Sequence, residues 1–106
     1  MIYLCVTTVT ADAAPDLARS LVEEQLAACV NIVPQVRSIY RWQGEVHDDA
    51  ESLLLIKTSP KTLSAFESRL RELHPYDCPE LLCLPIEKGM EQYMSWVEQM
   101  TTGSSR

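Results

Sequence analysis

Residues 29–58 read CVNIVPQVRSIYRWQGEVHDDAESLLLIKT, and this stretch decides the fold. Two runs rich in β-forming residues, Cys29–Trp42 and Glu45–Thr58, flank a turn at Gln43-Gly44. We predict a hairpin whose strands are about 13 or 14 residues long, against a usual length of about five or six. Such a hairpin must extend beyond the body of a small sheet.

The two strands of the hairpin differ in character. Pro34 cannot donate a ladder hydrogen bond, so the first strand belongs at the edge of the sheet or carries a bulge. The continuously apolar run 53–56 indicates that the second strand is central. An overhanging edge strand is an aggregation hazard unless another chain pairs with it. We therefore predict a homo-oligomer, because a second copy is the simplest partner for Val36, Ile39, Tyr40 and Trp42.

The segments around the hairpin supply three helices and two more strands. Ile2–Val9 is rich in β-formers, and the helical spacing of apolar residues from Leu17 to Leu26 predicts a first helix that ends near Ala27 or Ala28. Ser59-Pro60 is typical of a helix start. The apolar stripe of this second helix consists of Leu63, Phe66, Leu70 and Leu73.

Pro75 disfavours helical angles at His74 and so ends the second helix there. A short strand is expected over 80–86. Gly89 precedes a last helix, and its expected apolar face consists of Met90, Tyr93, Val97 and Met100.

This order predicts an α+β fold of the ferredoxin-like, split βαβ type, followed by an extra C-terminal helix. In that βαββαβ fold the strands lie in the order 4-1-3-2, which puts the proline-containing second strand at an edge. We expect residues 1–100 to form one domain and residues 101–106 to form a flexible tail.

Composition excludes several classes of function. The net charge is −6 and the nine basic residues are scattered, which argues against nucleic acid as a partner. The N-terminus lacks leader features, and no apolar run could cross a membrane. We therefore expect a cytoplasmic protein whose four cysteines, Cys5, Cys29, Cys78 and Cys83, stay reduced. Their spacing matches no zinc-ribbon pattern.

The stretch ELHPYDCPELLCLP, residues 72–85, concentrates residues that can carry chemistry. Cys83 lies among leucines and is expected to be a small buried apolar residue. Cys78 is expected in an exposed loop. His74 has two interpretations: it caps the carbonyls at a helix end, or it is a metal ligand or pocket residue.

Several stretches together resemble the CutA family of divalent-cation tolerance proteins: LAACVNIVP, YRWQGEV, LLLIKT, HPYDCPELLCLPI and YMSWV. The resemblance covers residues 1 to about 97. It implies a cytoplasmic homotrimer linked to tolerance of copper and other divalent metals. It also implies a trimer similar to the PII signalling proteins, which bind small effectors between subunits.

The resemblance implies copper ligands at Cys5 and His74, although a cysteine between Leu4 and Val6 in a strand is also typical of a core residue. Some members carry two adjacent histidines there, whereas this chain has Leu73 in the other position. A thiolate and an imidazole suit copper or zinc, but two ligands are too few for a closed tetrahedral zinc site. No organic cofactor is expected.

A second cluster of residues falls within the stretches that carry the resemblance and is expected to line the cleft between subunits. Its members are Cys29, Trp42, Glu45, Lys57, Tyr76 and Glu80. Lys57 either reaches the surface or pairs with an acid such as Glu80. A salt bridge at the trimer seam and a ligand site are both consistent with this pattern.

Three functions compete at this point. The first is a metal-binding trimer that responds to heavy metals, and the second is a PII-like module that binds a small molecule or a protein partner without a direct metal role. The third, an enzyme using a thiol–imidazole pair, lacks a family signature and a third orienting residue, so we expect no catalysis.

Overall fold

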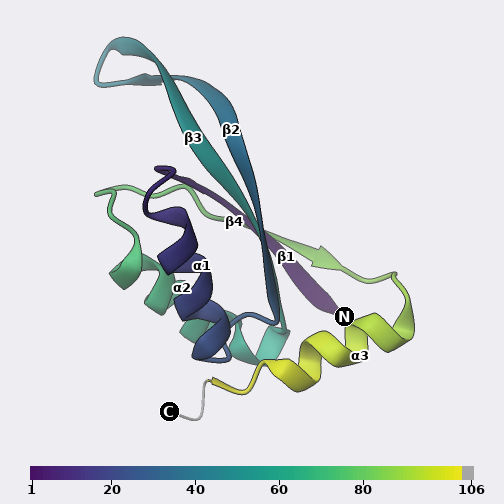
Figure 1. The fold of residues 1–106 in the computed structure, drawn as a ribbon. Helices are drawn as coiled ribbons and strands as arrows, with labels where there is room; N and C mark the ends of the chain where they lie inside the picture. The colour runs from purple at the N-terminus through teal and green to yellow at the C-terminus, as the bar shows by residue number, and fades with distance from the viewer. Residues whose placement is uncertain (104–106) are drawn as a thin grey trace.

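The computed structural model describes residues 1–103, and its elements follow the predicted order. Four strands form one antiparallel sheet in the order β2-β3-β1-β4 (Figure 1). The predicted α+β, ferredoxin-like topology with an additional C-terminal helix is confirmed. The elements are β1 (Ile2–Val9), α1 (Ala14–Glu23), β2 (Cys29–Trp42), β3 (Glu45–Thr58), a short 3₁₀ helix η1 (Pro60–Thr62), α2 (Leu63–Leu73), β4 (Leu82–Ile86) and α3 (Glu91–Met100).

The β2–β3 hairpin extends far beyond the rest of the sheet, as predicted (Figure 1). Gln43 and Gly44 both have left-handed backbone angles, with φ of 52° and 82°, which gives the two-residue turn that suits a twisted hairpin. Trp42 therefore pairs directly with Glu45. The register shifts between Val33 and Val36, so Pro34 lies at a bulge in the edge strand, where its missing N–H is tolerated.

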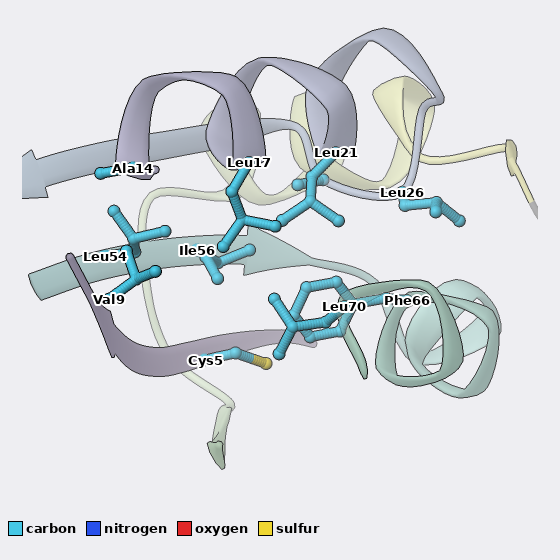
Figure 2. Packing of buried hydrophobic residues seen from close by; sticks show 11 residues of the cluster. Cys5, Val9, Ala14, Leu17, Leu21, Leu26, Leu54, Ile56, Phe66 and Leu70 are labelled. Carbon is cyan, nitrogen blue, oxygen red and sulfur yellow. The ribbon is translucent and has the colours of Figure 1, made fainter. Parts of the chain in front are cut away.

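The hydrophobic core lies between one face of the sheet and helices α1 and α2. Side chains alternate along β1 and β3, and the set facing the helices includes Cys5, Leu54 and Ile56. Figure 2 shows these side chains opposite those of Leu21 and Phe66, which come from α1 and α2. Each large buried side chain of this kind contributes about 1.5–3 kcal/mol of transfer free energy.

Helix α1 ends earlier than predicted. The apolar spacing through Leu26 predicted an end near Ala27 or Ala28, but the last helical residue is Glu23. Gln25 adopts a left-handed backbone with φ of 61°, and the N–H of Leu26 donates to the carbonyl of Leu21 over 2.9 Å. Leu26 is buried all the same, because the chain turns back onto the core. The last strand is also shorter than predicted, beginning at residue 82 rather than 80.

The opposite face of the sheet is apolar, and α3 covers only one end of it. Val97 of α3 is buried against Ile2 and Ala28, whereas the other residues of the predicted apolar face of α3 are exposed. On β1, β3 and β4, strand alternation places six more apolar residues on this face: Leu4, Val6, Leu53, Leu55, Leu82 and Leu84. We call these six residues the open face. Leu82 and Leu84 are 59% and 46% exposed.

Part of the expected flexible tail is packed. Thr101 is fully buried, and its hydroxyl lies 2.7 Å from Oγ of Ser59. The N–H of Gly103 donates to the carbonyl of Gln25 over 3.0 Å. Residues 104–106, the rest of that expected tail, lie outside the described residues. Within residues 1–103, no helix is long and apolar enough to cross a bilayer.

Candidate functional site

Cys5, one of the two predicted metal ligands, lies in the core. Its side chain has no exposed surface and packs with Ile56 and Phe66. Burial raises the pKa of its thiol above the usual range, and a hydrogen bond with Cys83, its partner on β4, raises it further. Metals bind the thiolate, so this environment opposes metal binding at Cys5.

His74, the other predicted ligand, is buried and uses both ring nitrogens. Its Nε2 lies 2.9 Å from the carbonyl oxygen of Thr8, and its Nδ1 accepts the N–H of Tyr76 over 3.2 Å. Tyr76 also packs against the imidazole edge-on, with ring centroids 4.7 Å apart. These contacts fix the loop that follows α2, and they favour the structural interpretation of His74 over the ligand interpretation.

Within residues 1–103, no hydrogen bond joins Cys5 to His74, whose ring nitrogens bond to Thr8 and Tyr76. His74 contacts Thr8, three residues along β1 from Cys5, a separation of about 10 Å at the rise of a strand. Within residues 1–103, no three His, Cys, Asp or Glu side chains gather closely enough to hold a metal ion. Leu73 packs against the core and supplies no ligand. Cys5 and His74 alone are too few ligands for a closed tetrahedral site.

A different site lies between the overhanging hairpin and the loop after α2. It is an open groove of about 750 Å³. Tyr40 and Trp42 line it from β2, Asp49 and Glu51 from β3, and Tyr76 from the loop. The remaining lining residues are Thr8, Ser38, Ile39, Asp77, Cys78 and Glu80. The groove thus combines aromatic side chains with four carboxylates. Among the described residues, no basic side chain lines it.

Two tyrosine–carboxylate hydrogen bonds organise this groove. The hydroxyl of Tyr76 donates to Oε2 of Glu51, and that of Tyr40 donates to Oδ2 of Asp49, each over 2.5 Å. Burial raises the pKa of Tyr76, and the bond to Glu51 raises it further. Glu51 is only 8% exposed, so its carboxylate is held beneath the groove by Tyr76 rather than by solvent.

The six residues predicted to line a cleft occupy three places in one chain. Trp42, Tyr76 and Glu80 line the groove. Glu45 pairs with Trp42 next to the hairpin turn. Cys29 and Lys57 lie on directly paired positions at the other end of the hairpin. Within one chain, over residues 1–103, Lys57 forms no ion pair with Glu80.

Sequence reasoning missed Tyr40, Asp49 and Glu51 as groove residues. A signal for them was present in the hairpin itself. Once the turn at Gln43-Gly44 is fixed, Ser38 must pair with Asp49, which makes Asp49 a diagonal neighbour of Tyr40. The same counting pairs Val36 with Glu51, the last pair before the bulge.

The comparisons with known proteins agree with this fold and hairpin. The family model described as CutA1 divalent ion tolerance protein matches residues 2–100. The chain belongs to the CutA1 family. It is 48% identical over 96 residues to the divalent-cation tolerance protein CutA of Thermus thermophilus, covering 91% of this chain and 93% of that protein.

Other CutA relatives are longer. The chain is 44% identical over 92 residues to Protein CutA of Homo sapiens, which covers 87% of this chain but 51% of that protein. The chain thus spans about half the length of that relative.

Solved CutA structures share the whole fold. The structure of the divalent cation tolerance protein from Thermus thermophilus has a TM-score of 0.91 at 47% identity and covers 95% of this chain and 99% of its own. The structure of the PII-like protein CutA of Nostoc sp. PCC 7120, in apo form, has a TM-score of 0.90 at 36% identity. The match covers 93% of this chain and 96% of that chain. The sequence resemblance to the CutA family is therefore confirmed along nearly the whole chain.

Proposed function

We propose that this CutA1 family member is a cytoplasmic, non-catalytic homotrimer that binds a small cationic ligand in the groove beside its hairpin. This role would connect divalent-cation tolerance, the property in the family's name, to ligand binding rather than to a buried metal centre. The observation that carries the proposal is the acidic, aromatic groove around the buried Glu51–Tyr76 pair.

The trimer is supported by the open face. Six apolar residues on one side of a sheet form a patch of the kind that marks protein–protein contacts. The exposed apolar residues Ile39 and Val46 near the hairpin end, 65% and 66% exposed, add a second unpartnered surface. We propose that other copies of the chain cover both surfaces, and the resemblance to the CutA family implies that there are three copies.

The chemistry of the groove favours a positive charge. Asp49, Glu51, Asp77 and Glu80 give it a negative potential, which raises the local concentration of cations. Tyr40, Trp42 and Tyr76 also line it, and the faces of aromatic rings attract cations at short range. Because no tight ligand cluster is present in residues 1–103, the cation we expect is hydrated or organic, such as an amine.

The proposal is tested by calorimetric titration of metal-free, fully reduced protein with a panel of small amines and divalent cations. Binding should weaken at least tenfold in Glu51→Gln and stay unchanged in Glu23→Gln, which removes an exposed carboxylate from α1. Equal affinity in the two variants, or anions binding better than cations, would contradict it.

Direct copper binding by Cys5 and His74 is the second candidate, and the family's name favours it. It would require Cys5 to lose its proton and His74 to release Thr8 or Tyr76, so binding would be coupled to a local opening of the loop. The titration described in the Discussion separates it from the groove hypothesis.

A further inference from the structure

A compact cluster of reactive side chains lies at the base of the hairpin, outside the groove. Nζ of Lys57 lies 3.7 Å from Sγ of Cys29, and it also donates to Oδ1 of Asn31. The Cys29 thiol lies 3.8 Å from the same oxygen. Cys29 and Lys57 are directly opposite one another on β2 and β3, so the backbone ladder fixes their separation.

Cys29 is partly shielded in the single chain. It is neither buried nor fully exposed, and Lys57 has the same intermediate exposure. Tyr93 of α3 lies nearby: desolvation raises the pKa of its phenol, and Cys29 adds to that rise. The sulfur thus has an amine on one side and an aromatic ring in its vicinity.

We propose that Cys29 is a peroxide-sensitive thiol and that Lys57 is its resolving amine, which forms a covalent Sγ–Nζ bond across β2 and β3. The proposal rests on this geometry alone and does not depend on the groove or on its ligand. It adds a modification site to the chain, with hydrogen peroxide as the class of reactant.

The chemistry takes place in two balanced steps. First, the Cys29 sulfur attacks one peroxide oxygen; the O–O bond breaks, sulfur becomes a sulfenic acid and one water leaves. Second, Nζ of Lys57, after losing a proton, attacks the oxidised sulfur. The S–O bond breaks, hydroxide leaves and takes up a proton as the second water, and an S–N bond remains. Sulfur is oxidised by two electrons and the peroxide is reduced, while the protein loses two hydrogen atoms.

The other three cysteines lack this arrangement. Cys5 is fully buried, with a pKa raised by burial. Cys83 pairs with Cys5. Cys78 is exposed in the loop that lines the acidic groove. Within residues 1–103, no hydrogen bond or ion pair links Cys78 to an amine. Cys78 therefore serves as an internal control for simple exposure.

The bond would have a local structural consequence. It joins two residues already in register, so the strands need not move. It removes the ammonium charge of Lys57 and its bond to Asn31, and it cross-links the hairpin where the hairpin leaves the sheet. Reduction by a thiol would reverse it, as with other sulfur–nitrogen links of this oxidation level.

The test treats the folded, reduced chain with stoichiometric hydrogen peroxide, quenches it and records intact mass and a tryptic peptide map without reductant. We expect a loss of two hydrogen atoms, a joined peptide pair containing Cys29 and Lys57, no tryptic cleavage after Lys57, and reversal by dithiothreitol. Cys78→Ser should give the same product.

The decisive variant is Lys57→Arg, which keeps the positive charge but removes the nucleophilic amine. Its Cys29 should gain oxygen instead, as a sulfenic acid that dimedone traps, with no two-hydrogen loss. Identical oxygen adducts on Cys29 in the wild type and in Lys57→Arg would overturn the proposal. So would an unreactive Cys29, or joined peptides that contain Cys5 and Cys83. If Lys57→Arg fails to fold, the wild-type peptide map alone tests the proposal, through the presence or absence of the joined peptides that contain Cys29 and Lys57.

Discussion

His74 donates its Nε2–H to the carbonyl oxygen of Thr8 over 2.9 Å, tying the end of α2 to the end of β1. The direction of this bond follows from the other nitrogen. Nδ1 accepts the N–H of Tyr76, so it carries no proton, and the ring proton must be on Nε2. The imidazole is therefore a bridge between two backbone groups. A bridge of this kind positions Tyr76 for its bond to Glu51 in the groove.

Replacing His74 should destabilise the fold. His74→Ala leaves the carbonyl of Thr8 and the N–H of Tyr76 without partners, which should lower the free energy of unfolding by about 1–3 kcal/mol. Urea denaturation followed by circular dichroism measures this. The matched control is His47→Ala: His47 lies near the hairpin tip, where it stacks on Tyr40, so a change within about 0.5 kcal/mol is expected there. Equal losses in both variants would show that the bridge is not what stabilises the loop.

Copper binding should not depend on Cys5. Because the thiol of Cys5 is buried and its pKa is raised, Cys5→Ala should leave the stoichiometry and affinity of Cu(I) and Cu(II) unchanged. Anaerobic titration of metal-free, reduced protein measures both. One tight ion per chain in the wild type that is lost in Cys5→Ala, with the oligomer intact, would establish the copper site and overturn the groove hypothesis for metals.

The hairpin was predictable from sequence because its signals are local. Gln43-Gly44 and the flanking β-rich runs specify both strands to the residue, and Pro34 marks the bulge. The end of α1 was not predictable in this way. A left-handed residue ends the helix, and here that residue is Gln25 rather than the glycine that usually signals it.

The parts of the candidate site that sequence did not predict depend on contacts between residues that are distant in the chain. Tyr76 and Glu51 are 25 positions apart and meet only because the loop after α2 folds against β3. The ligand pair Cys5 and His74 came from the family resemblance. The position of Cys5 in an apolar strand favoured a core residue, whereas nothing in the sequence predicted that His74 is buried. Burial of that kind depends on tertiary packing rather than on residue type.

A charge on the open face should disrupt self-association. Leu84 is 46% exposed on that face, and Leu84→Asp places a carboxylate where we expect another copy to pack. Native mass spectrometry and light scattering should show a shift from trimer to monomer. Val22→Asp is the control, because Val22 is 40% exposed on α1 and the charge change is the same. The trimer proposal fails if Leu84→Asp keeps the mass of the wild type or if both variants dissociate equally.

The residues after α3 should contribute to stability. Thr101 is buried among polar partners that include Ser59, and a Cβ at Gly103 would collide with the carbonyl oxygen of Glu24. A chain that ends at Met100 should melt several degrees below one that ends at Gly103. Gly103→Ala in the longer chain should lower the melting temperature too. Equal melting of the three chains would mean that these contacts are not significant for stability.

The bond between Tyr76 and Glu51 should make stability fall at high pH. The folded pKa of Tyr76 is raised, first by burial and then by Glu51, above the usual value of about 10. The unfolded chain therefore releases this proton first, so the stabilisation is complete below about pH 10 and is lost as pH rises further. Cys5 acts in the same direction because its pKa is also raised.

Tyr76→Phe isolates the tyrosine contribution. At neutral pH it should lower the free energy of unfolding by about 1–3 kcal/mol, because the buried carboxylate of Glu51 loses its donor. Above about pH 10 the difference from wild type should shrink, since the wild type loses the same interaction. Tyr40→Phe should cost less at neutral pH, because its partner Asp49 is exposed and solvent replaces the lost donor. Urea denaturation at a series of pH values measures this difference. If the difference in free energy of unfolding between wild type and Tyr76→Phe stays constant across this range, the phenol proton is not coupled to folding.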